Sequence, residues 1–172
     1  MPAANLMEEN RRLVRYLKNA GIIRSRRVER AFLSVPRHEF VLEEMREHAY
    51  VDAPLPTIHG QTISQPSIVA TMLEELDLRP GHKVLEVGAG SGWNACLIAS
   101  IVKPGKVISI EIDETLVRFA RRNVRKLGIE NVRIIHGDGS LGYEKEAPFD
   151  RIIVTCLLYT SDAADDGESV DI

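Results

Sequence analysis

The chain has 172 residues, of which 44% are hydrophobic and 27% are charged, and its net charge is −3 at pH 7. These values are ordinary for one soluble globular domain with an appendage, and the slight negative charge gives no electrostatic signature of nucleic-acid binding. No uninterrupted stretch of ~18 apolar residues and no secretory signal are found, so the sequence predicts neither membrane association nor secretion.

The amino-terminal part of the chain has the pattern of short amphipathic helices. Helical spacing of apolar residues predicts helices over 5–20 and 26–34, and a third over 68–76. The arginines around the second helix alternate with acidic and apolar residues, which indicates a solvated face rather than a nucleic-acid site. Between the second and third helices, residues 50–66 are rich in Pro, Gly, Thr and Ser and are expected to form a loop.

Beyond Pro80-Gly81, strand patterns and helix patterns alternate. The expected strands are 83–87, 106–111, 132–135 and 150–155, and the expected helices are 92–102 and 114–127. This alternation is typical of an α/β fold, in which a parallel sheet carries helices on both faces and binds a cofactor at the carboxyl ends of the strands.

The sequence VLEVGAGSGWN at residues 84–94 combines a buried strand, a glycine turn and the start of a helix. Glycines at such a turn let the backbone approach a ligand, and the helix start offers unpaired N–H donors. A dinucleotide fingerprint would need a third glycine at position 93, where this chain has Trp93. The motif instead resembles the first motif of S-adenosylmethionine-dependent methyltransferases.

Two acidic residues follow at the ends of later strands. Glu111 ends the strand 106–111, where a carboxylate can accept hydrogen bonds from both ribose hydroxyls of a cofactor. Asp138 lies between Gly137 and Gly139 after the next strand, and we expect it to receive the adenine amino group, although a turn is the alternative.

Four motifs in order resemble the protein-L-isoaspartate O-methyltransferase family, over residues of about 5–155. They are VPRHEFV at 35–41, AYVDAPLP with GQTISQP at 49–66, the glycine turn, and APFDRIIVT at 147–155. The resemblance implies a Rossmann-like sheet with an amino-terminal helical extension, S-adenosyl-L-methionine as cofactor, and a monomer. It also implies methylation of the free α-carboxylate of isoaspartyl residues in damaged proteins, a repair reaction.

The family's functional residues carry over to matching positions. Ser64 corresponds to the active-site serine, and the cofactor contacts correspond to Gln61, Thr62, Ile63, Ser64, Gly88, Ala89, Gly90, Glu111, Asp138 and Gly139. The acceptor carboxylate is ionised at neutral pH, so the reaction needs no general base, metal or cysteine nucleophile. Ser64 has no nucleophile elbow, which argues against a Ser-His-Asp triad. His59 lies near this loop and is interpreted as a solvated or turn residue.

The two cysteines have no partners at metal-ligand spacing. Cys96 and Cys156 therefore predict neither a zinc site nor a disulfide framework, and they favour a reducing compartment, the cytoplasm. Cys96 lies on the helix 92–102 and is expected to be a small core residue.

The end of the chain departs from the family pattern. Residues 156–166 resemble a translated sequencing adaptor, so we expect residues 156–172 to be a non-native tail and the later strands of the sheet to be missing. We therefore expect this chain to be an inactive or impaired fragment of the parent enzyme. The expected organisation is amino-terminal helices and an active-site loop at 1–78, followed by an incomplete cofactor-binding core at 79–155. Two alternatives remain: another Rossmann methyltransferase, acting on tRNA or a small molecule, and a cofactor-binding fragment without catalysis.

Overall fold

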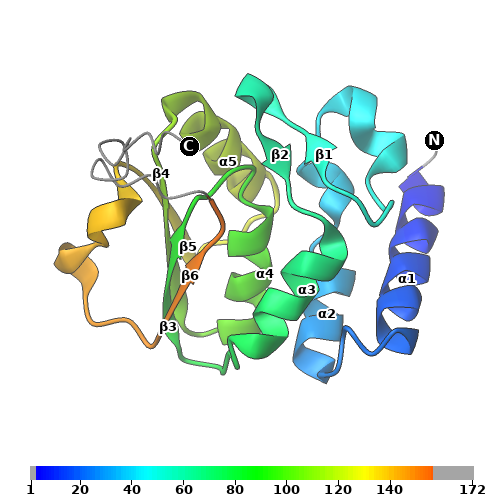
Figure 1. Ribbon diagram of the computed structural model, residues 1–172, viewed down its shortest axis with the longest axis horizontal. Coiled ribbons are helices and arrows are strands. Elements are labelled where there is room, and N and C mark those ends of the chain that lie inside the picture. The colour runs from blue at the N-terminus through cyan, green and yellow to red at the C-terminus, as the bar shows by residue number, and fades with distance from the viewer. Residues whose placement is uncertain (1–2, 157–172) are drawn as a thin grey trace, which may run out of the picture.

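The computed structural model describes residues 3–156, and its centre is a four-stranded parallel sheet (Figure 1). The strand order is β5-β4-β3-β6, with bounds of Lys83–Val87 for β3, Lys106–Glu111 for β4, Val132–His136 for β5 and Arg151–Val154 for β6. β3 and β4 are rich in Val and Ile and are buried on both faces, as central parallel strands are. The parallel sheet expected from the sequence is therefore confirmed.

Two helices follow β3 and β4 and connect them to the next strands. α4, Trp93–Val102, is apolar on nearly all sides because it lies between the sheet and the amino-terminal helices. α5, Glu114–Lys126, buries one face and starts at Asp113, whose carboxylate accepts hydrogen bonds from the N–H groups of Thr115 and Leu116. Both helices begin at the carboxyl ends of strands.

The amino-terminal residues form three helices beyond α4. α1 is Ala3–Asn19, α2 is Arg26–Ser34 and α3 is Pro66–Glu75, and Figure 1 shows them on the side of α4 away from the sheet. One hydrophobic cluster extends from these helices through α4 to β3, β4 and β5. Because they share this core, the helical part is held in a defined position against the cofactor-binding motif.

Within the expected loop 50–66, the structure has a hairpin that the sequence did not predict. β1, Leu55–Pro56, pairs antiparallel with β2, Thr62–Ile63, and the tip between them contains His59 with a positive φ of 54°. Each strand has only two residues, which is too short for an alternating pattern to be recognised.

The second face of the sheet carries a small cluster of Leu85, Val87, Ile108 and Ile110, packed against Ile135, Tyr143 and Phe149. In the described part of the chain, Tyr143 and Phe149, which lie just before and after the 3-10 turn Glu144–Glu146, pack on this face in place of α-helices. The expectation of helices on both faces is therefore met on one face only. The expected tail lies outside the described residues except for Cys156, and no helix among those residues is long and apolar enough to cross a membrane.

Candidate cofactor site

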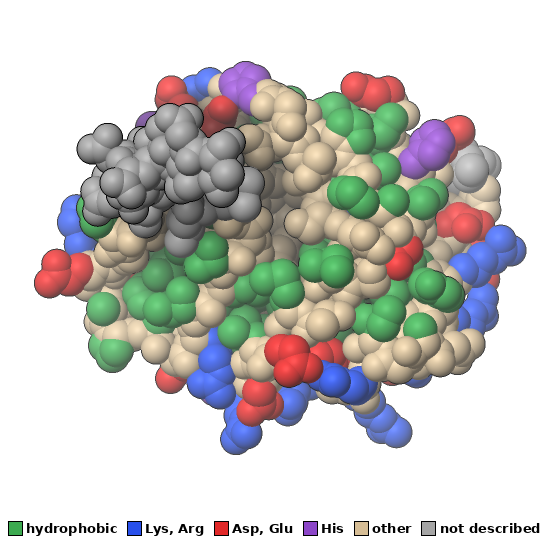
Figure 2. Space-filling view, in the orientation of Figure 1, with side chains coloured by type: hydrophobic (Ala, Val, Ile, Leu, Met, Phe, Trp, Pro, Cys, Tyr) green, Lys and Arg blue, Asp and Glu red, His purple; other side chains and the backbone are tan. Residues whose placement is uncertain are grey.

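A cavity of about 890 Å³ opens at the carboxyl ends of the strands. It is visible as a hollow in the upper central part of Figure 2. All ten residues that the sequence assigned to the site line this cavity, although they come from four separate regions of the chain: Gln61, Thr62, Ile63, Ser64, Gly88, Ala89, Gly90, Glu111, Asp138 and Gly139.

The glycine turn after β3 forms the floor of the cavity. The N–H groups of Gly88 and Ala89 both donate to the carbonyl of Ile110, at 2.8 and 3.1 Å, which holds the turn against the end of β4. Gly88 has a φ of 96°, and a Cβ at this position would lie 2.8 Å from the Cβ of Cys156. Glycine is therefore required at residue 88 by both the backbone conformation and the space available.

Trp93 explains why the motif departs from a dinucleotide fingerprint. Its ring is buried, packs edge-on against Phe32 with 5.5 Å between ring centroids, and its Nε1–H donates to the carbonyl of Val35 at 3.3 Å. A large side chain is accommodated because its ring packs against the end of α2, beside the start of α4.

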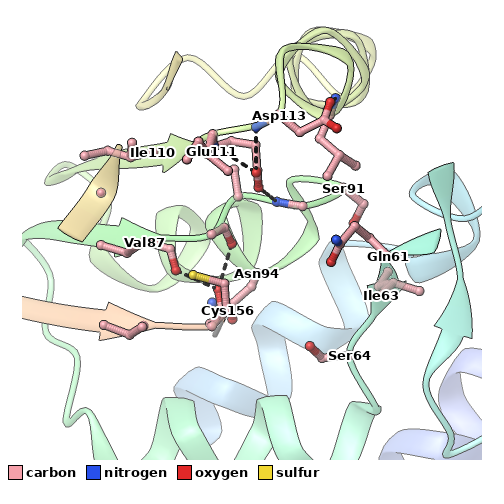
Figure 3. A pocket seen from close by; sticks show the side chains of 18 of the residues that line it. Gln61, Ile63, Ser64, Val87, Ser91, Asn94, Ile110, Glu111, Asp113 and Cys156 are labelled. Atoms are coloured by element: carbon pink, nitrogen blue, oxygen red, sulfur yellow. Dashed lines mark hydrogen bonds between the residues drawn. The ribbon is translucent and has the colours of Figure 1, made fainter. Parts of the chain in front are cut away.

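Glu111 connects the glycine turn to the end of β4. Its Oε2 accepts a hydrogen bond from the N–H of Gly90 at 2.9 Å, and its Oε1 accepts from Ile112 and Asp113 at 2.9 and 3.1 Å (Figure 3). A carboxylate offers about four lone-pair directions, and three of them are used by backbone donors. The carboxylate is thus rigidly oriented at the cavity wall, with limited remaining capacity to accept a ligand hydroxyl.

A second carboxylate, Glu86, lies behind the glycine turn and is fully buried. It accepts hydrogen bonds from Asn94 Nδ2 at 2.7 Å and from the hydroxyl of Ser109. Burial raises the pKa of Glu86 to about 7, since neither partner carries a positive charge. Asn94 Oδ1 is buried without a hydrogen-bond partner, and after the amide turns over this oxygen can accept a hydrogen bond from the protonated carboxyl group of Glu86.

The hairpin residues Gln61–Ser64 form the wall opposite Glu111, and Figure 3 shows Ser64 and Glu111 on different sides of the cavity. The carbonyl of Ser64 accepts a hydrogen bond from Arg37 Nη2 at 3.1 Å. No hydrogen bond to the Ser64 hydroxyl forms within residues 3–156, so this donor is available to a ligand.

Asp138 and Gly139 lie at the rim after β5. Asp138 Oδ1 accepts from the N–H of Ser140 at 2.9 Å, and this hydrogen bond lowers the pKa of the carboxyl group. A Cβ at Gly139 would clash with the side chain of Val87, so this position brings the backbone close to β3. Asp138, which the sequence assigns to the adenine amino group, thus makes a local turn that lies at the cavity.

Several cavity residues were not assigned from the sequence, although most are neighbours of assigned ones: Ser91, Trp93, Asn94, Ile112, Asp113, Leu116 and Cys156. The position of most of these residues next to the glycine turn or to Glu111 in the sequence was the signal that could have identified them. Cys96 is buried in α4, as expected for a core residue. Within the described range, no group of three or more His, Cys, Asp or Glu side chains is arranged to hold a metal ion.

Comparisons with known proteins point to one family. Residues 8–159 match the family model described as protein-L-isoaspartate(D-aspartate) O-methyltransferase. A protein-L-isoaspartate O-methyltransferase of Methanopyrus kandleri is 58% identical over 146 residues, which cover 84% of this chain and 65% of that protein. A protein of the same name from Pyrococcus horikoshii is 55% identical over 155 residues, which cover 90% and 70% of the two chains.

Solved structures agree with these relatives. A protein-L-isoaspartate O-methyltransferase structure superposes with a TM-score of 0.78 at 37% identity, covering 85% of this chain and 47% of that one. A structure described as a putative enzyme of this kind from Plasmodium falciparum, in complex with S-adenosyl-L-homocysteine, has a TM-score of 0.71 at 33% identity and covers 83% and 71%. The chain thus spans about two thirds of the length of the curated relatives it matches.

Proposed function

Because this chain belongs to the protein-L-isoaspartate(D-aspartate) O-methyltransferase family, we propose that its cavity binds S-adenosyl-L-methionine. We further propose that the protein methylates the free α-carboxylate of L-isoaspartyl residues in damaged proteins. The observation that carries the proposal is the convergence of the ten assigned residues on one cavity.

The residues around the cavity fit this cofactor. Gly90 has a φ of 53°, and no heavy atom beyond its chain neighbours lies within 4 Å of the position that a Cβ would take, so the backbone there is open to close approach by a ligand. Glu111 presents an oriented carboxylate with about one lone-pair direction left for a single ribose hydroxyl, and the exposed rim residue Asp138 can accept a hydrogen bond from an amino group. When bound, the cofactor supplies a sulfonium methyl group, which is electrophilic.

Ser64 is assigned to the acceptor. The acceptor carboxylate is already ionised at neutral pH, with a pKa of about 3.5–4, so the protein has to orient it rather than activate it. The free hydroxyl of Ser64 donates one hydrogen bond to one carboxylate oxygen and leaves the other as nucleophile. Orientation of this kind contributes several kcal/mol of the ~7–11 kcal/mol available to well-aligned reactions.

The cellular compartment and the oligomeric state are proposed from other observations. Cys96 and Cys156 are free thiols, which supports a reducing compartment such as the cytoplasm. The protein is proposed to act as a monomer on isoaspartyl-containing proteins, and sedimentation of the purified chain tests the monomeric state.

The experiment uses the 172-residue chain, methyl-labelled S-adenosyl-L-methionine, and two peptides that differ only in carrying isoaspartyl or aspartyl at one position. A base-labile methyl ester is expected on the isoaspartyl peptide alone, with impaired turnover by the 172-residue chain. A second protein is compared, in which the residues after Thr155 are replaced by the matching carboxyl-terminal third of the Methanopyrus kandleri relative. If both bind the cofactor and neither labels the isoaspartyl peptide, the proposed activity is wrong. In a parallel assay with tRNA as the acceptor, transfer of the label to the tRNA would instead identify another Rossmann methyltransferase.

A further inference from the structure

Arg37 is the largest fully buried side chain in the described part of the chain, with 1% of its surface exposed. Burial lowers the pKa of Arg37 to about 10, which leaves the guanidinium group charged at neutral pH. Burying a charge is costly unless close polar partners replace water. The contacts of this side chain therefore show what the charge is used for.

The guanidinium group donates to backbone carbonyls of the loop that carries Ser64. Nη1 lies 2.7 Å from the carbonyl oxygen of Ala49, and Nη2 lies 3.1 Å from those of Ala53 and Ser64. Longer contacts reach Val51 at 3.4 Å and Ile63 at 3.5 Å. One planar group thus joins the beginning and the end of the loop 49–64.

The same guanidinium group also contacts the cofactor side of the cavity. Its central carbon lies 5.3 Å from the centroid of the Trp93 ring, which is within the range of a cation–π interaction. Trp93 directly follows the glycine turn and lines the cavity. Arg37 is therefore in contact with both the hairpin wall and the start of α4.

We propose that Arg37 is a positioning residue for methyl transfer, which fixes the backbone at Ser64 relative to the glycine turn through its bridge to Trp93. This inference rests on the proposed function. Arg37 does not itself line the cavity, so it acts through Ser64 and Trp93. A lysine keeps the charge and loses the planar fork that reaches several carbonyls at once.

Methyl transfer and cofactor binding are expected to respond differently when the β1-β2 hairpin is held less rigidly. Methyl transfer needs the acceptor in line with the methyl group, and a displacement of about 1 Å can cost on the order of 100-fold in rate. Cofactor affinity is spread over the hairpin residues Gln61–Ser64, the glycine turn, Glu111 and the rim, and Arg37 donates hydrogen bonds only to the first of these. The rate of transfer is therefore expected to fall much more than cofactor affinity.

The test compares the Arg37→Lys variant with the wild-type chain of 172 residues. We expect kcat for the isoaspartyl peptide to fall at least about tenfold, in line with that sensitivity to displacement, whereas the Kd for S-adenosyl-L-homocysteine changes far less. Trp93 is the chain's single tryptophan, so its fluorescence measures this Kd. Backbone amide exchange at 61–64 should accelerate while exchange at 84–87 stays unchanged.

Arg151→Lys is the matched control, because Arg151 also donates to a backbone carbonyl, that of Leu76 at 2.8 Å, and does not line the cavity. The Arg151→Lys variant should change neither kcat nor the rate of backbone amide exchange at 61–64. If Arg37→Lys does not fold, Arg37→Gln, which keeps a planar head with two N–H donors, takes its place.

Two results would overturn the inference: an unchanged kcat in the Arg37 variant, or a loss of kcat matched by an equal loss of cofactor affinity. If neither the wild-type chain nor the protein extended after Thr155 methylates the isoaspartyl peptide, the proposed function fails separately. Backbone amide exchange then still decides whether Arg37 fixes residues 61–64, and an unchanged exchange rate there would refute the positioning role of Arg37.

Discussion

Nδ1 of His59 lies 2.6 Å from Oδ2 of Asp113, and this hydrogen bond links the tip of the β1-β2 hairpin to the first turn of α5. The two residues are 54 positions apart in the sequence. Gln61–Ser64 and Glu111–Asp113 line opposite parts of the same cavity. The contact therefore spans the cavity and holds the hairpin over it.

The first prediction concerns the pH dependence of this contact. The hydrogen bond from His59 lowers the pKa of Asp113 below its usual 3.8. A carboxyl group with a lowered pKa stabilises the fold above its unfolded-state pKa, and the stabilisation disappears as the pH falls through the folded-state value. Asp113→Asn removes the charge and keeps a good N-cap residue.

We therefore expect wild type to have the higher melting temperature at pH 5 and the difference from Asp113→Asn to shrink below about pH 4, near the unfolded-state pKa of Asp. Glu114→Gln, which changes an exposed charge on the same helix, is the control. A difference between wild type and Asp113→Asn that is constant from pH 5 to pH 2.5 would contradict this account of the hydrogen bond.

The second prediction concerns Glu86. Its pKa is raised by burial from 4.5 to about 7, so the folded protein holds a proton that the unfolded chain has released in this range. The free energy of unfolding should therefore decrease as the pH rises from about 4.5 to 7, by on the order of 3 kcal/mol at ~1.4 kcal/mol per pKa unit.

Glu86→Gln should remove this slope, because the amide stays neutral and can donate to the unpartnered Oδ1 of Asn94 after that side chain turns over. Denaturant unfolding at several pH values measures the effect. Parallel pH profiles for the two proteins would show that Glu86 does not titrate in this window.

The third prediction concerns Glu111. Glu111→Ala should weaken S-adenosyl-L-methionine binding by roughly 1.5–3 kcal/mol, the range for a charge-assisted hydrogen bond. The structure adds a second effect, since the N–H groups of Gly90, Ile112 and Asp113 lose their acceptor. Calorimetric titration and thermal unfolding measure the two effects separately, and an unchanged cofactor affinity would remove Glu111 from the site.

The fourth prediction concerns Ser64. Ser64→Ala should lower turnover on an isoaspartyl peptide by about 10–100-fold, as expected for one hydrogen bond to a charged group, while cofactor affinity stays nearly constant. Ser100→Ala is the control, because Ser100 lies in α4 and its hydroxyl contacts Ser34 outside the cavity. Isolation of a covalent intermediate on Ser64 would refute the orienting role, because direct transfer to a carboxylate forms none.

Local patterns were sufficient for the elements whose residues alternate or repeat over several positions. The expected bounds of β3, β4 and α2 agree with the structure, since a buried strand needs a continuous Val/Ile run and a short amphipathic helix needs one apolar face. The hairpin β1-β2 was not predicted, because two-residue strands carry no such period. The absence of described helices on the second face also could not be read from the alternation of strands and helices.

The sequence by itself determined the glycine turn, the carboxylates at the strand ends and the order in which they occur. These are local properties, set by which residues permit a positive φ and which end a buried strand. Tertiary structure alone decided which groups meet: Glu111 with the N–H of Gly90, His59 with Asp113, and Arg37 with Ser64 and Trp93. These contacts join residues far apart in the chain, and their geometry depends on the pairing of parallel strands and on one shared core, which no local pattern encodes.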